Sequence, residues 1–329
     1  MRRLLVLGGG AWGTALALLA RRAGAVPHLW ARDPEIAASI NERHQNPLFL
    51  PGIALDPAIA ASSDLAASIA GAEALVVAVP AQFVRALLDR LAPAIPEGLP
   101  LLLCSKGIEL ASGKTMSELA QEILPRSALA VLSGPSFALE VARDLPAAVV
   151  IASHDPALAR HFIAAFANPR FRPYLSGDPI GAEIGGAVKN VIAIACGIVQ
   201  GRGLGNNARA AVITRGLAEM TRLGLAKGGR AETMSGLSGL GDLVLTCSGG
   251  LSRNHALGLA LGRGESLERA LEGRRSVVEG VATAPAVVGL AARLGVEMPI
   301  AQAVEAVLHR GASIDAMTTQ LLQRPYRSE

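Results

Sequence analysis

The feature that most constrains this chain is a glycine-rich turn near its N-terminus. The turn has the sequence GGGAWG over residues 8–13, and it follows an apolar run over residues 4–7. Residues 14–22 are rich in alanine and leucine, which is typical of a helix. A strand, a G-x-G-x-x-G turn and a helix, in this order, make up the fingerprint of dinucleotide-binding domains. The sequence therefore predicts a nucleotide-binding unit at the start of the chain.

Each glycine of this fingerprint has an expected role. Gly8 would make the tight turn, Gly10 would let the backbone approach a pyrophosphate, and Gly13 would let helix and strand pack closely. The anion would then lie against free N–H groups at the positive end of the helix.

A secretory signal peptide is the main alternative for this stretch. Two arginines at positions 2 and 3, an apolar run and the tripeptide AGA at 23–25 fit such a signal. Against it, three glycines interrupt the apolar run, and two arginines directly precede the supposed cleavage site. A second strand candidate over residues 25–30 follows at once, as a βαβ unit requires. We therefore prefer the dinucleotide-binding interpretation.

The residues after the second strand bear on the choice between NAD and NADP. Dinucleotide folds contact the adenosine ribose here, with an acidic residue for a 2′-hydroxyl or an arginine for a 2′-phosphate. Arg32 favours NADP, and the alternative for this residue is a solvated loop charge. Asp33 is also suited to cap a helix that begins at Pro34. The preference therefore stays open between NADP and NAD.

The first half of the chain alternates apolar strands with helices. Continuous apolar runs cover residues 74–79, 101–104 and 129–132, a helix is expected over 82–91, and further strands are expected over 147–151 and 171–175. Strands without polar alternation are buried on both faces by helices. The pattern predicts an α/β fold with a Rossmann-like, doubly wound parallel sheet. Ligands of such sheets bind beyond the carboxyl ends of the strands, where Lys106, Ser136 and the glycine turn all fall.

The pattern changes near residue 180. From there the strand-like runs stop, and alanine-rich helical segments separated by glycines take over. We expect a dinucleotide-binding domain over residues 1–180 and an all-α substrate and catalytic domain over residues 181–329.

Composition narrows the classes of partner. Hydrophobic residues make up 51% and charged residues 18% of the chain, as in globular proteins. No uncharged apolar run reaches the roughly 18 residues that a membrane helix needs. A net charge of +4 with 3% aromatic residues favours a small anion over nucleic acid. The widely spaced Cys104, Cys196 and Cys247 favour a reducing, cytoplasmic location. The six histidines show no zinc-binding spacing, so we expect no metal.

The most unusual residue is a lysine in an apolar helix. Lys189 is the only charge over residues 184–199, and Asn190 follows it. An unpaired ammonium in such surroundings is costly, so it should be paired or have a lowered pKa. Such a lysine is a candidate general acid and base. A lysine that lies along a helix edge with its head in water would give the same sequence.

Two further stretches carry isolated polar residues. Asp242 stands alone among the glycines and aliphatic residues of 236–247, with Thr246 one helical turn further on, and it could pair with a buried lysine. Ser252, Arg253 and Asn254 precede a helical run and are suited to hold a phosphate. The alternative is that Asp242, Ser252 and Asn254 are ordinary helix caps.

At this point the chain resembles the NAD(P)-dependent glycerol-3-phosphate dehydrogenases of bacterial phospholipid synthesis. The resemblance covers nearly the whole chain in the expected order. It rests on GGGAWGTALA from Gly8, SKGIE from Ser105, LSGPSFA from Leu132, GGAVKNVIAIA from Gly185, ARAAVITRGLAEM from Ala208, GLGDLVLTC from Gly239, SRN from Ser252, VVEG from Val277 and GVEMPI from Gly295.

The resemblance implies an oxidoreductase that interconverts sn-glycerol 3-phosphate and dihydroxyacetone phosphate by hydride transfer with NAD or NADP. It also implies a homodimer, for which the large apolar helical half is a second argument. Lys189 would exchange the proton, with Asp242 and Thr246 completing its pocket. The substrate would contact Lys106, Gly134, Ser136, Lys189, Asn190, Asp242, Ser252, Arg253 and Asn254. The cofactor would contact Gly8, Gly10, Ala11, Trp12, Gly13, Arg32, Lys106, Ala138, Arg253, Val277 and Glu279.

One departure and two alternatives accompany this interpretation. Ala11 stands where some family members have serine, which removes one hydroxyl from the phosphate site. A related two-domain dehydrogenase of a hydroxy acid or sugar acid is the leading alternative, but a carboxylate substrate would not need the phosphate-binding SRN segment. A catalytically inert dinucleotide-binding sensor would leave Lys189 and Asp242 without a role.

Overall fold

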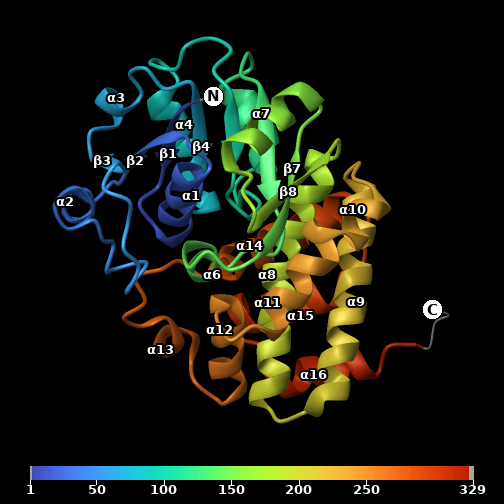
Figure 1. The fold of residues 1–329 in the computed structure, drawn as a ribbon. Coiled ribbons are helices and arrows are strands. Elements are labelled where there is room, and N and C mark those ends of the chain that lie inside the picture. Colours follow the sequence, from blue (N-terminus) through green and yellow to red (C-terminus); the bar gives the residue numbers. More distant parts are fainter. Residues whose placement is uncertain (1, 326–329) are drawn as a thin grey trace.

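The computed structural model describes residues 2–325 of the chain. A sheet flanked by helices forms one half, and a helical body forms the other (Figure 1). The strands are β1 (Arg3–Leu7), β2 (Val26–Trp30), β3 (Ala60–Ser62), β4 (Ala74–Val77), β5 (Leu101–Leu103), β6 (Leu129–Ser133), β7 (Ala147–Ala152) and β8 (Phe171–Ser176). They form one eight-stranded sheet in the order β3-β2-β1-β4-β5-β6-β7-β8.

The central strands are buried on both faces, as their apolar sequences predict. In β1, Leu4 and Val6 belong to the hydrophobic core on one side of the sheet, and Leu5 and Leu7 belong to the core on the other side. Side chains that alternate between two cores require apolar residues at every position. The Rossmann-like arrangement is therefore confirmed.

Helices cover the two faces of the sheet. They are α1 (Ala11–Arg22), α2 (Pro34–Arg43), α3 (Leu65–Ser68), the 3₁₀ turn η1 (Ala81–Phe83), α4 (Val84–Leu91), α5 (Met116–Ile123), α6 (Ala138–Ala142) and α7 (Pro156–Phe166). Local sequence signals determine where several of these helices begin. Asp33 caps α2 by accepting a hydrogen bond from Glu35 N at 3.0 Å, and Thr115 caps α5 in a capping box with Glu118.

The sheet differs from the prediction at the edge formed by β7 and β8. Strand β7 runs antiparallel to β6, whereas all the other paired strands are parallel. The only helix in the connection is α6, which at about 1.5 Å per residue spans about 7.5 Å. That is too short to carry the chain back along a strand of about 20 Å. The edge strand β3 was not predicted, because three small residues give no apolar pattern.

The second half is built around one long helix, α8 (Pro179–Gly201). Around it lie α9 (Gly205–Ala226), α10 (Ala231–Ser235), the π-helical turn η2 (Leu237–Gly241), α11 (Asp242–Ser248), α12 (Arg253–Gly262), α13 (Leu267–Leu271), α14 (Glu279–Arg293), α15 (Pro299–His309) and α16 (Ile314–Leu322). Helices α9, α11, α12, α14 and α15 all pack on α8. The sheet ends at Ser176 and α8 begins at Pro179, while the division at residue 180 stays a prediction.

Helix α8 is long and apolar enough, by length and composition alone, to cross a membrane. However, 94% of its most apolar 18-residue window is buried inside the protein, as in the core helix of a soluble protein. Its contact with α12 is unusually close. A Cβ atom on Gly197 would lie 2.2 Å from His255 O, and one on Gly258 would lie 2.0 Å from Ile194 O. These glycines let α8 and α12 touch along their backbones, which brings residues 189–190 near residues 253–254.

Candidate active site

The glycine turn between β1 and α1 has the geometry that a dinucleotide requires. Gly8 has φ +129°, and its N–H donates to Trp30 O at 2.9 Å. A Cβ atom on Gly13 would lie 1.9 Å from Gly8 O, so helix and strand could not pack around a larger residue. A Cβ atom on Gly10 would meet nothing within 4 Å. Gly8 and Gly13 are thus required by the fold, whereas Gly10 leaves the backbone open to a ligand.

The start of α1 offers donors to that ligand. Its N-cap residue is Gly10, and no side chain caps the helix. The buried Nε1 of Trp12 has no hydrogen-bond partner among residues 2–325. Uncapped N–H groups and an unpaired indole N–H suit a phosphate-bearing cofactor. Sequence reasoning missed the side chain that holds the turn: Asn46 Nδ2 donates to Gly9 O and Thr14 Oγ1, both at 2.9 Å. The only signal was the Asn46–Pro47 pair, which is typical of a turn.

Arg32 and Asp33, which follow β2, have different roles. Asp33 is engaged as the cap of α2. Arg32 is exposed, and its guanidinium donates no hydrogen bond to any described residue. This leaves Arg32 available to an anion beside the turn.

The centre of the site is a carboxylate between two ammonium groups. Lys189 on α8 donates to Asp242 Oδ1 and, at 3.0 Å, to Thr246 Oγ1. Lys106, from the loop after β5, donates to Asp242 Oδ2 at 2.8 Å. Asp242 and Thr246 lie one turn apart on α11, directly after the π-helical turn η2. The two halves of the molecule therefore meet at Asp242.

Burial and charge set the pKa values of this cluster. Burial lowers the pKa of Lys189 to about 8, while the charge of Asp242 acts in the opposite direction and that of Lys106 lowers it further. Burial alone would raise the pKa of Asp242, but the two ammonium groups hold it below its usual value. Asp242 is therefore ionised at neutral pH, and Lys189 can gain or lose a proton there.

Lys106 also links the cluster to the loop after β6. Its Nζ donates to Gly134 O at 2.8 Å and lies 3.5 Å from Ser136 Oγ, which in turn donates to Gly134 O. Gly134 has φ +127°, and a Cβ atom there would approach Val149 Cα to 3.0 Å. Ala138 begins α6, which packs against α1 and so lies beside the glycine turn.

The SRN segment begins α12. Ser252 caps the helix by accepting a hydrogen bond from His255 N at 3.2 Å, so its hydroxyl has the alternative role that the sequence allowed. Asn254 is buried and donates to Asn190 Oδ1 at 2.9 Å. Arg253 is exposed, and its guanidinium donates no hydrogen bond within residues 2–325. Arg253 is thus the member of this segment whose side-chain donors are all unused within the described residues.

Glu279 stands between the two halves at the start of α14. Its Oε1 accepts a hydrogen bond from Ala81 N at 3.1 Å, but its buried Oε2 has no partner in the described part of the chain. Burial raises the pKa of Glu279 to about 7, with the Ala81 N–H and the charge of Arg253 acting against that rise. Sequence reasoning missed Thr283, one turn further on, whose buried hydroxyl also lacks a hydrogen-bond partner among residues 2–325. Both oxygens face Gly107 at 3.5–3.6 Å from where its Cβ would be.

The expected site residues fall into three groups. One continuous hydrogen-bonded network joins Lys106, Gly134, Ser136, Lys189, Asn190, Asp242, Thr246 and Asn254. A second group lies at the α1 turn and comprises Gly8, Gly10, Ala11, Trp12 and Gly13. Arg32, Ala138, Ser252, Arg253, Val277 and Glu279 have no side-chain hydrogen bond to either group, and Val277 is exposed. The open Gly10, the unpaired Trp12 indole and the unpaired Glu279 oxygen fit a dinucleotide bound across these groups.

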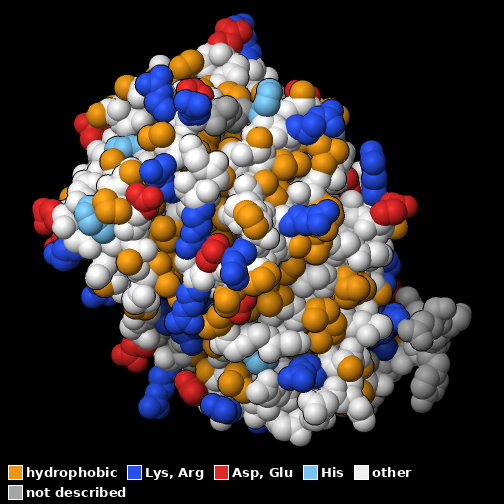
Figure 2. Space-filling model, viewed as in Figure 1, with side chains coloured by type: hydrophobic (Ala, Val, Ile, Leu, Met, Phe, Trp, Pro, Cys, Tyr) orange, Lys and Arg blue, Asp and Glu red, His pale blue; other side chains and the backbone are white. Residues whose placement is uncertain are grey.

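The positive charges on one face of the molecule also fit an anionic ligand. Figure 2 shows Lys and Arg side chains gathered near the middle of the face on which α6 and α12 lie. Basic side chains raise the local concentration of phosphate compounds. Among residues 2–325, no group of three His, Cys, Asp or Glu side chains is placed to hold a metal ion.

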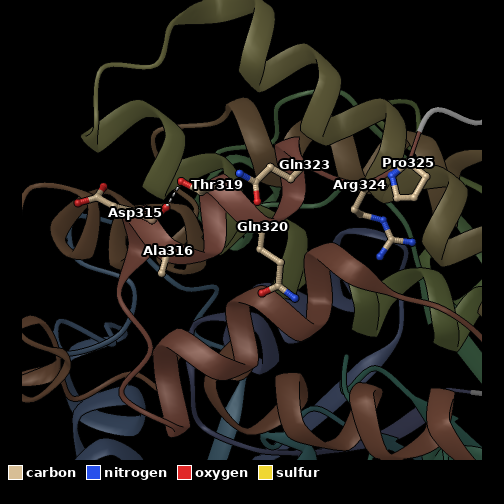
Figure 3. Close-up of a pocket in the computed structure, with 7 residues that line it drawn as sticks. All are labelled: Asp315, Ala316, Thr319, Gln320, Gln323, Arg324 and Pro325. Atoms are coloured by element: carbon tan, nitrogen blue, oxygen red, sulfur yellow. Dashed lines mark hydrogen bonds between the residues drawn. The ribbon is translucent and has the colours of Figure 1, made fainter.

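A hollow of about 700 Å³ lies elsewhere, on α16 (Figure 3). Its lining residues are Asp315, Ala316, Thr319, Gln320, Gln323, Arg324 and Pro325. None of them belongs to the site above, and none of the described buried side-chain atoms that lack a partner lies among them. We assign it no role in the chemistry.

A Rossmann-like half with an open glycine turn, joined to a helical half that supplies a buried lysine, defines a two-domain, nicotinamide-dependent dehydrogenase. Comparison with known families makes this more specific. Residues 3–159 match the model of the NAD-dependent glycerol-3-phosphate dehydrogenase N-terminus, and residues 178–319 match that of its C-terminus. The chain belongs to the NAD-dependent glycerol-3-phosphate dehydrogenase family.

Individual relatives of the chain carry the name of the same enzyme family. The chain is 56% identical to the glycerol-3-phosphate dehydrogenase (NAD(P)+) of Rhodospirillum rubrum, over 99% of this chain and 93% of the relative. It is 58% identical to that of Caulobacter vibrioides, over 98% of each chain. Its structure resembles the crystal structure of glycerol-3-phosphate dehydrogenase from Coxiella burnetii with a TM-score of 0.95, at 38% identity and over 98% of this chain and 99% of that one.

Proposed function

We propose that this chain is an oxidoreductase that interconverts sn-glycerol 3-phosphate and dihydroxyacetone phosphate with NAD or NADP, and that it supplies glycerol 3-phosphate for phospholipid synthesis. The observation that carries the proposal is the buried Lys189, bonded to Asp242 where the two halves meet. Membership of the family supports the choice of substrate. The domain division at residue 180 and the site residues named above form part of this proposal.

The dinucleotide would lie on the α1 turn, with Gly10, Trp12 and Glu279 offering the open groups described above. When bound, it would donate a hydride to the substrate carbon during ketone reduction and accept one from it during alcohol oxidation. The protein supplies position, charge and a proton.

Lys189 provides the proton. During ketone reduction, negative charge develops on the carbonyl oxygen as the hydride reaches carbon, and the Lys189 ammonium donates a proton to that oxygen. During alcohol oxidation, the neutral Lys189 amine takes the hydroxyl proton. Asp242 stays ionised in both directions, because Lys106 remains beside it when Lys189 loses its charge. A pKa of about 8 makes both states of Lys189 accessible near neutral pH.

Arg253 holds the substrate at its other end. Its guanidinium can donate two parallel hydrogen bonds to a phosphate, and it stands at the N-terminus of α12. Binding the phosphate away from the reacting carbon orients the carbonyl toward Lys189. This phosphate contact distinguishes the proposed enzyme from a hydroxy-acid or sugar-acid dehydrogenase, because a substrate carboxylate would not need it.

The test is the oxidation of NADPH and NADH by the purified protein with dihydroxyacetone phosphate or with unphosphorylated dihydroxyacetone. We expect kcat/KM to be far higher for the phosphorylated ketone. Equal rates with the two ketones, or activity only with a 2-oxo acid, would contradict the proposal.

We further propose a homodimer in the cytoplasm. The large apolar helical half of the chain supports the dimer, as does the resemblance to the family. Analytical ultracentrifugation at micromolar concentration tests the dimer, since a single species at the mass of one chain would contradict it. Localisation is tested by fractionating cells and assaying the soluble cytoplasmic fraction.

A further inference from the structure

One buried asparagine, far from the charged cluster in the sequence, contacts the glycine turn directly. Asn46 lies in the loop after α2 and is only 1% exposed. Its Nδ2 donates to Gly9 O and to Thr14 Oγ1, both at 2.9 Å. Its Oδ1 accepts a hydrogen bond from Phe49 N at 3.4 Å. Both N–H groups of the Asn46 amide are therefore used inside the protein, and none is left for a ligand.

The orientation of this amide is fixed by its backbone partners. The Gly9 carbonyl can only accept a hydrogen bond, so it requires the nitrogen of Asn46. The Phe49 N–H can only donate, so it requires the oxygen of Asn46. Exchanging the two amide atoms would oppose like groups at both contacts. The donor of Asn46 therefore always faces the turn.

The loop that carries Asn46 is itself held in place. Leu50 N donates to Asn46 O at 2.8 Å, and Gln45 pairs with Ala54 in an isolated β-bridge. The Leu50 side chain is 2% exposed and belongs to the same hydrophobic core as Leu16 of α1. Because the loop and α1 share one core, the amide keeps a fixed position against the turn.

The Gly9 carbonyl belongs to the same peptide group as the Gly10 N–H. In a trans peptide these two groups point in opposite directions. Because Gly9 O points at Asn46, the Gly10 N–H points away from it. That N–H donates to no residue among 2–325, and a Cβ atom on Gly10 would meet nothing within 4 Å. The Gly10 N–H is therefore an unused donor on the open side of the turn.

A peptide between two glycines can turn over with little steric penalty, because neither residue has a Cβ atom to oppose the rotation. A flipped peptide would present the Gly9 carbonyl oxygen to an anion and turn the Gly10 N–H inward, which replaces an attraction with a repulsion. The Asn46 amide would also lose its acceptor, and a buried donor without a partner is costly. The contact with Asn46 therefore favours the peptide orientation that a pyrophosphate needs.

We propose that Asn46 is a positioning residue for the dinucleotide, which directs the Gly10 N–H toward the pyrophosphate by bonding the Gly9 carbonyl. The inference rests on the proposed function, because that function places the dinucleotide on the α1 turn. It requires no contact between Asn46 and the cofactor. Since NADH and NADPH carry the same pyrophosphate, replacing Asn46 should weaken the binding of both equally.

The test compares Asn46→Ala and Asn46→Asp with wild type by fluorescence titration of NADH and of NADPH. Alanine leaves the Gly9 carbonyl without its donor, and aspartate keeps the shape of asparagine but places an acceptor against that carbonyl. We expect both Kd values to rise by about tenfold or more in each variant, the effect of losing one charge-assisted hydrogen bond. At saturating cofactor, kcat and KM for dihydroxyacetone phosphate should change by less than about threefold.

Two further variants separate positioning from a simple loss of stability. Asn41→Ala is the matched control, because Asn41 on α2 also makes two hydrogen bonds to the backbone, but both join it to Ala61 of β3. Thr14→Val removes the other partner of the Asn46 amide and leaves the Gly9 carbonyl bonded. Each control should lower Tm and leave both Kd values within about twofold of wild type.

Unchanged Kd values in Asn46→Asp would overturn the proposal. An equal rise in Asn46→Asp and Thr14→Val would also overturn it, because the anchoring of the loop, and not the peptide orientation, would then be responsible. So would a rise for NADPH alone, which would point to the 2′-phosphate. Asn46→Asp has nearly the volume of asparagine and supplies the measurement if Asn46→Ala fails to fold. The titrations need no ketone, so a failure of the substrate assignment would appear only in the assay with dihydroxyacetone phosphate.

Discussion

The Lys189 ammonium and the Asp242 carboxylate form an ion pair in which both side chains are almost fully buried, at 8% and 1% exposure. The two residues lie 53 positions apart in the sequence, on α8 and α11. Isolating either charge there would be costly, so the pair is a strong constraint on how the two helices pack. It also leaves the ammonium with a lowered pKa beside a carboxylate that stays charged. A proton held in that way can be transferred to a substrate.

The first prediction concerns the lysine itself. Lys189→Met should lower kcat by about 10²-fold or more, the usual effect of losing a general acid and base. The variant should fold and bind NADPH, because Lys106 still pairs with Asp242. Steady-state kinetics and a fluorescence titration of NADPH measure the two effects. Lys114→Met, which removes an exposed ion pair with Glu122, is the control and should keep near-normal kcat. Near-normal turnover in Lys189→Met would show that the lysine is structural.

The second prediction concerns the pH dependence of both reaction directions. Since the pKa of Lys189 is about 8, alcohol oxidation should become faster as pH rises through about 8, because it needs the neutral amine. Ketone reduction should become slower over the same range, because it needs the ammonium. The charge of Lys106 lowers the pKa of Lys189, so Lys106→Gln should move both inflections to higher pH. Profiles of kcat/KM that are flat between pH 7 and 9 would contradict this assignment.

The third prediction tests cofactor choice at the end of β2. Arg32 donates no hydrogen bond to any described residue and is exposed beside the α1 turn. If it holds a 2′-phosphate, Arg32→Ala should raise KM for NADPH by roughly tenfold, the effect of one charge-assisted contact. KM for NADH should barely change. Equal losses with both cofactors would instead indicate damage to the turn or to pyrophosphate binding.

The fourth prediction concerns stability. Glu183 on α8 is buried and accepts hydrogen bonds from the backbone and hydroxyl of Ser117 on α5. Burial raises its pKa from 4.5 to about 7, helped by the nearby Glu118. Between these two pH values the folded protein holds a proton that the unfolded chain has released. The contribution of Glu183 therefore makes the free energy of unfolding fall as pH rises from 4.5 to about 7, by about 3 kcal/mol.

Glu183→Gln removes this titration. The difference in unfolding free energy between variant and wild type should grow in favour of the variant as pH rises through that window, and level off above it. Urea unfolding at several pH values measures the difference. A difference that stays constant with pH would show that Glu183 titrates normally.

How far the sequence predicted the structure depends on how local each signal was. The strands and the glycine turn follow from patterns within a few residues, such as the uninterrupted apolar run of β1. The antiparallel β7 and the short β3 did not follow, because strand direction and edge pairing depend on the rest of the sheet. Lys189 and Asp242 could each be singled out as isolated charges, but their pairing was only a hypothesis until α8 and α11 were placed side by side.

Other parts of the site had no usable local signal. Asn46, which holds the glycine turn, and Thr283, which faces Gly107 beside Glu279, are ordinary polar residues in the sequence. Their importance comes from burial and from partners far along the chain. Asn190 likewise donates a hydrogen bond to the Lys106 carbonyl, 84 positions away in the sequence. Residue type and spacing cannot reveal which donors remain free.

The last prediction tests whether the substrate carries a phosphate at all. Arg253 is exposed at the first turn of α12, its guanidinium donates to no described residue, and Ser252 caps the helix beside it. A guanidinium matches a phosphate with two parallel hydrogen bonds, which a lysine cannot reproduce. Arg253→Lys should therefore raise KM for dihydroxyacetone phosphate markedly, with a few kcal/mol at stake for a bidentate, charge-assisted pair. Because phosphate binding also orients the carbonyl toward Lys189, kcat should fall as well. Unphosphorylated dihydroxyacetone has no group for Arg253 to hold, so its poor rate should be nearly unaffected.

The decisive quantity is the ratio of kcat/KM for the two ketones in wild type and variant. If that ratio does not change, Arg253 does not bind the phosphate, and the assignment of a phosphorylated substrate loses its main local support.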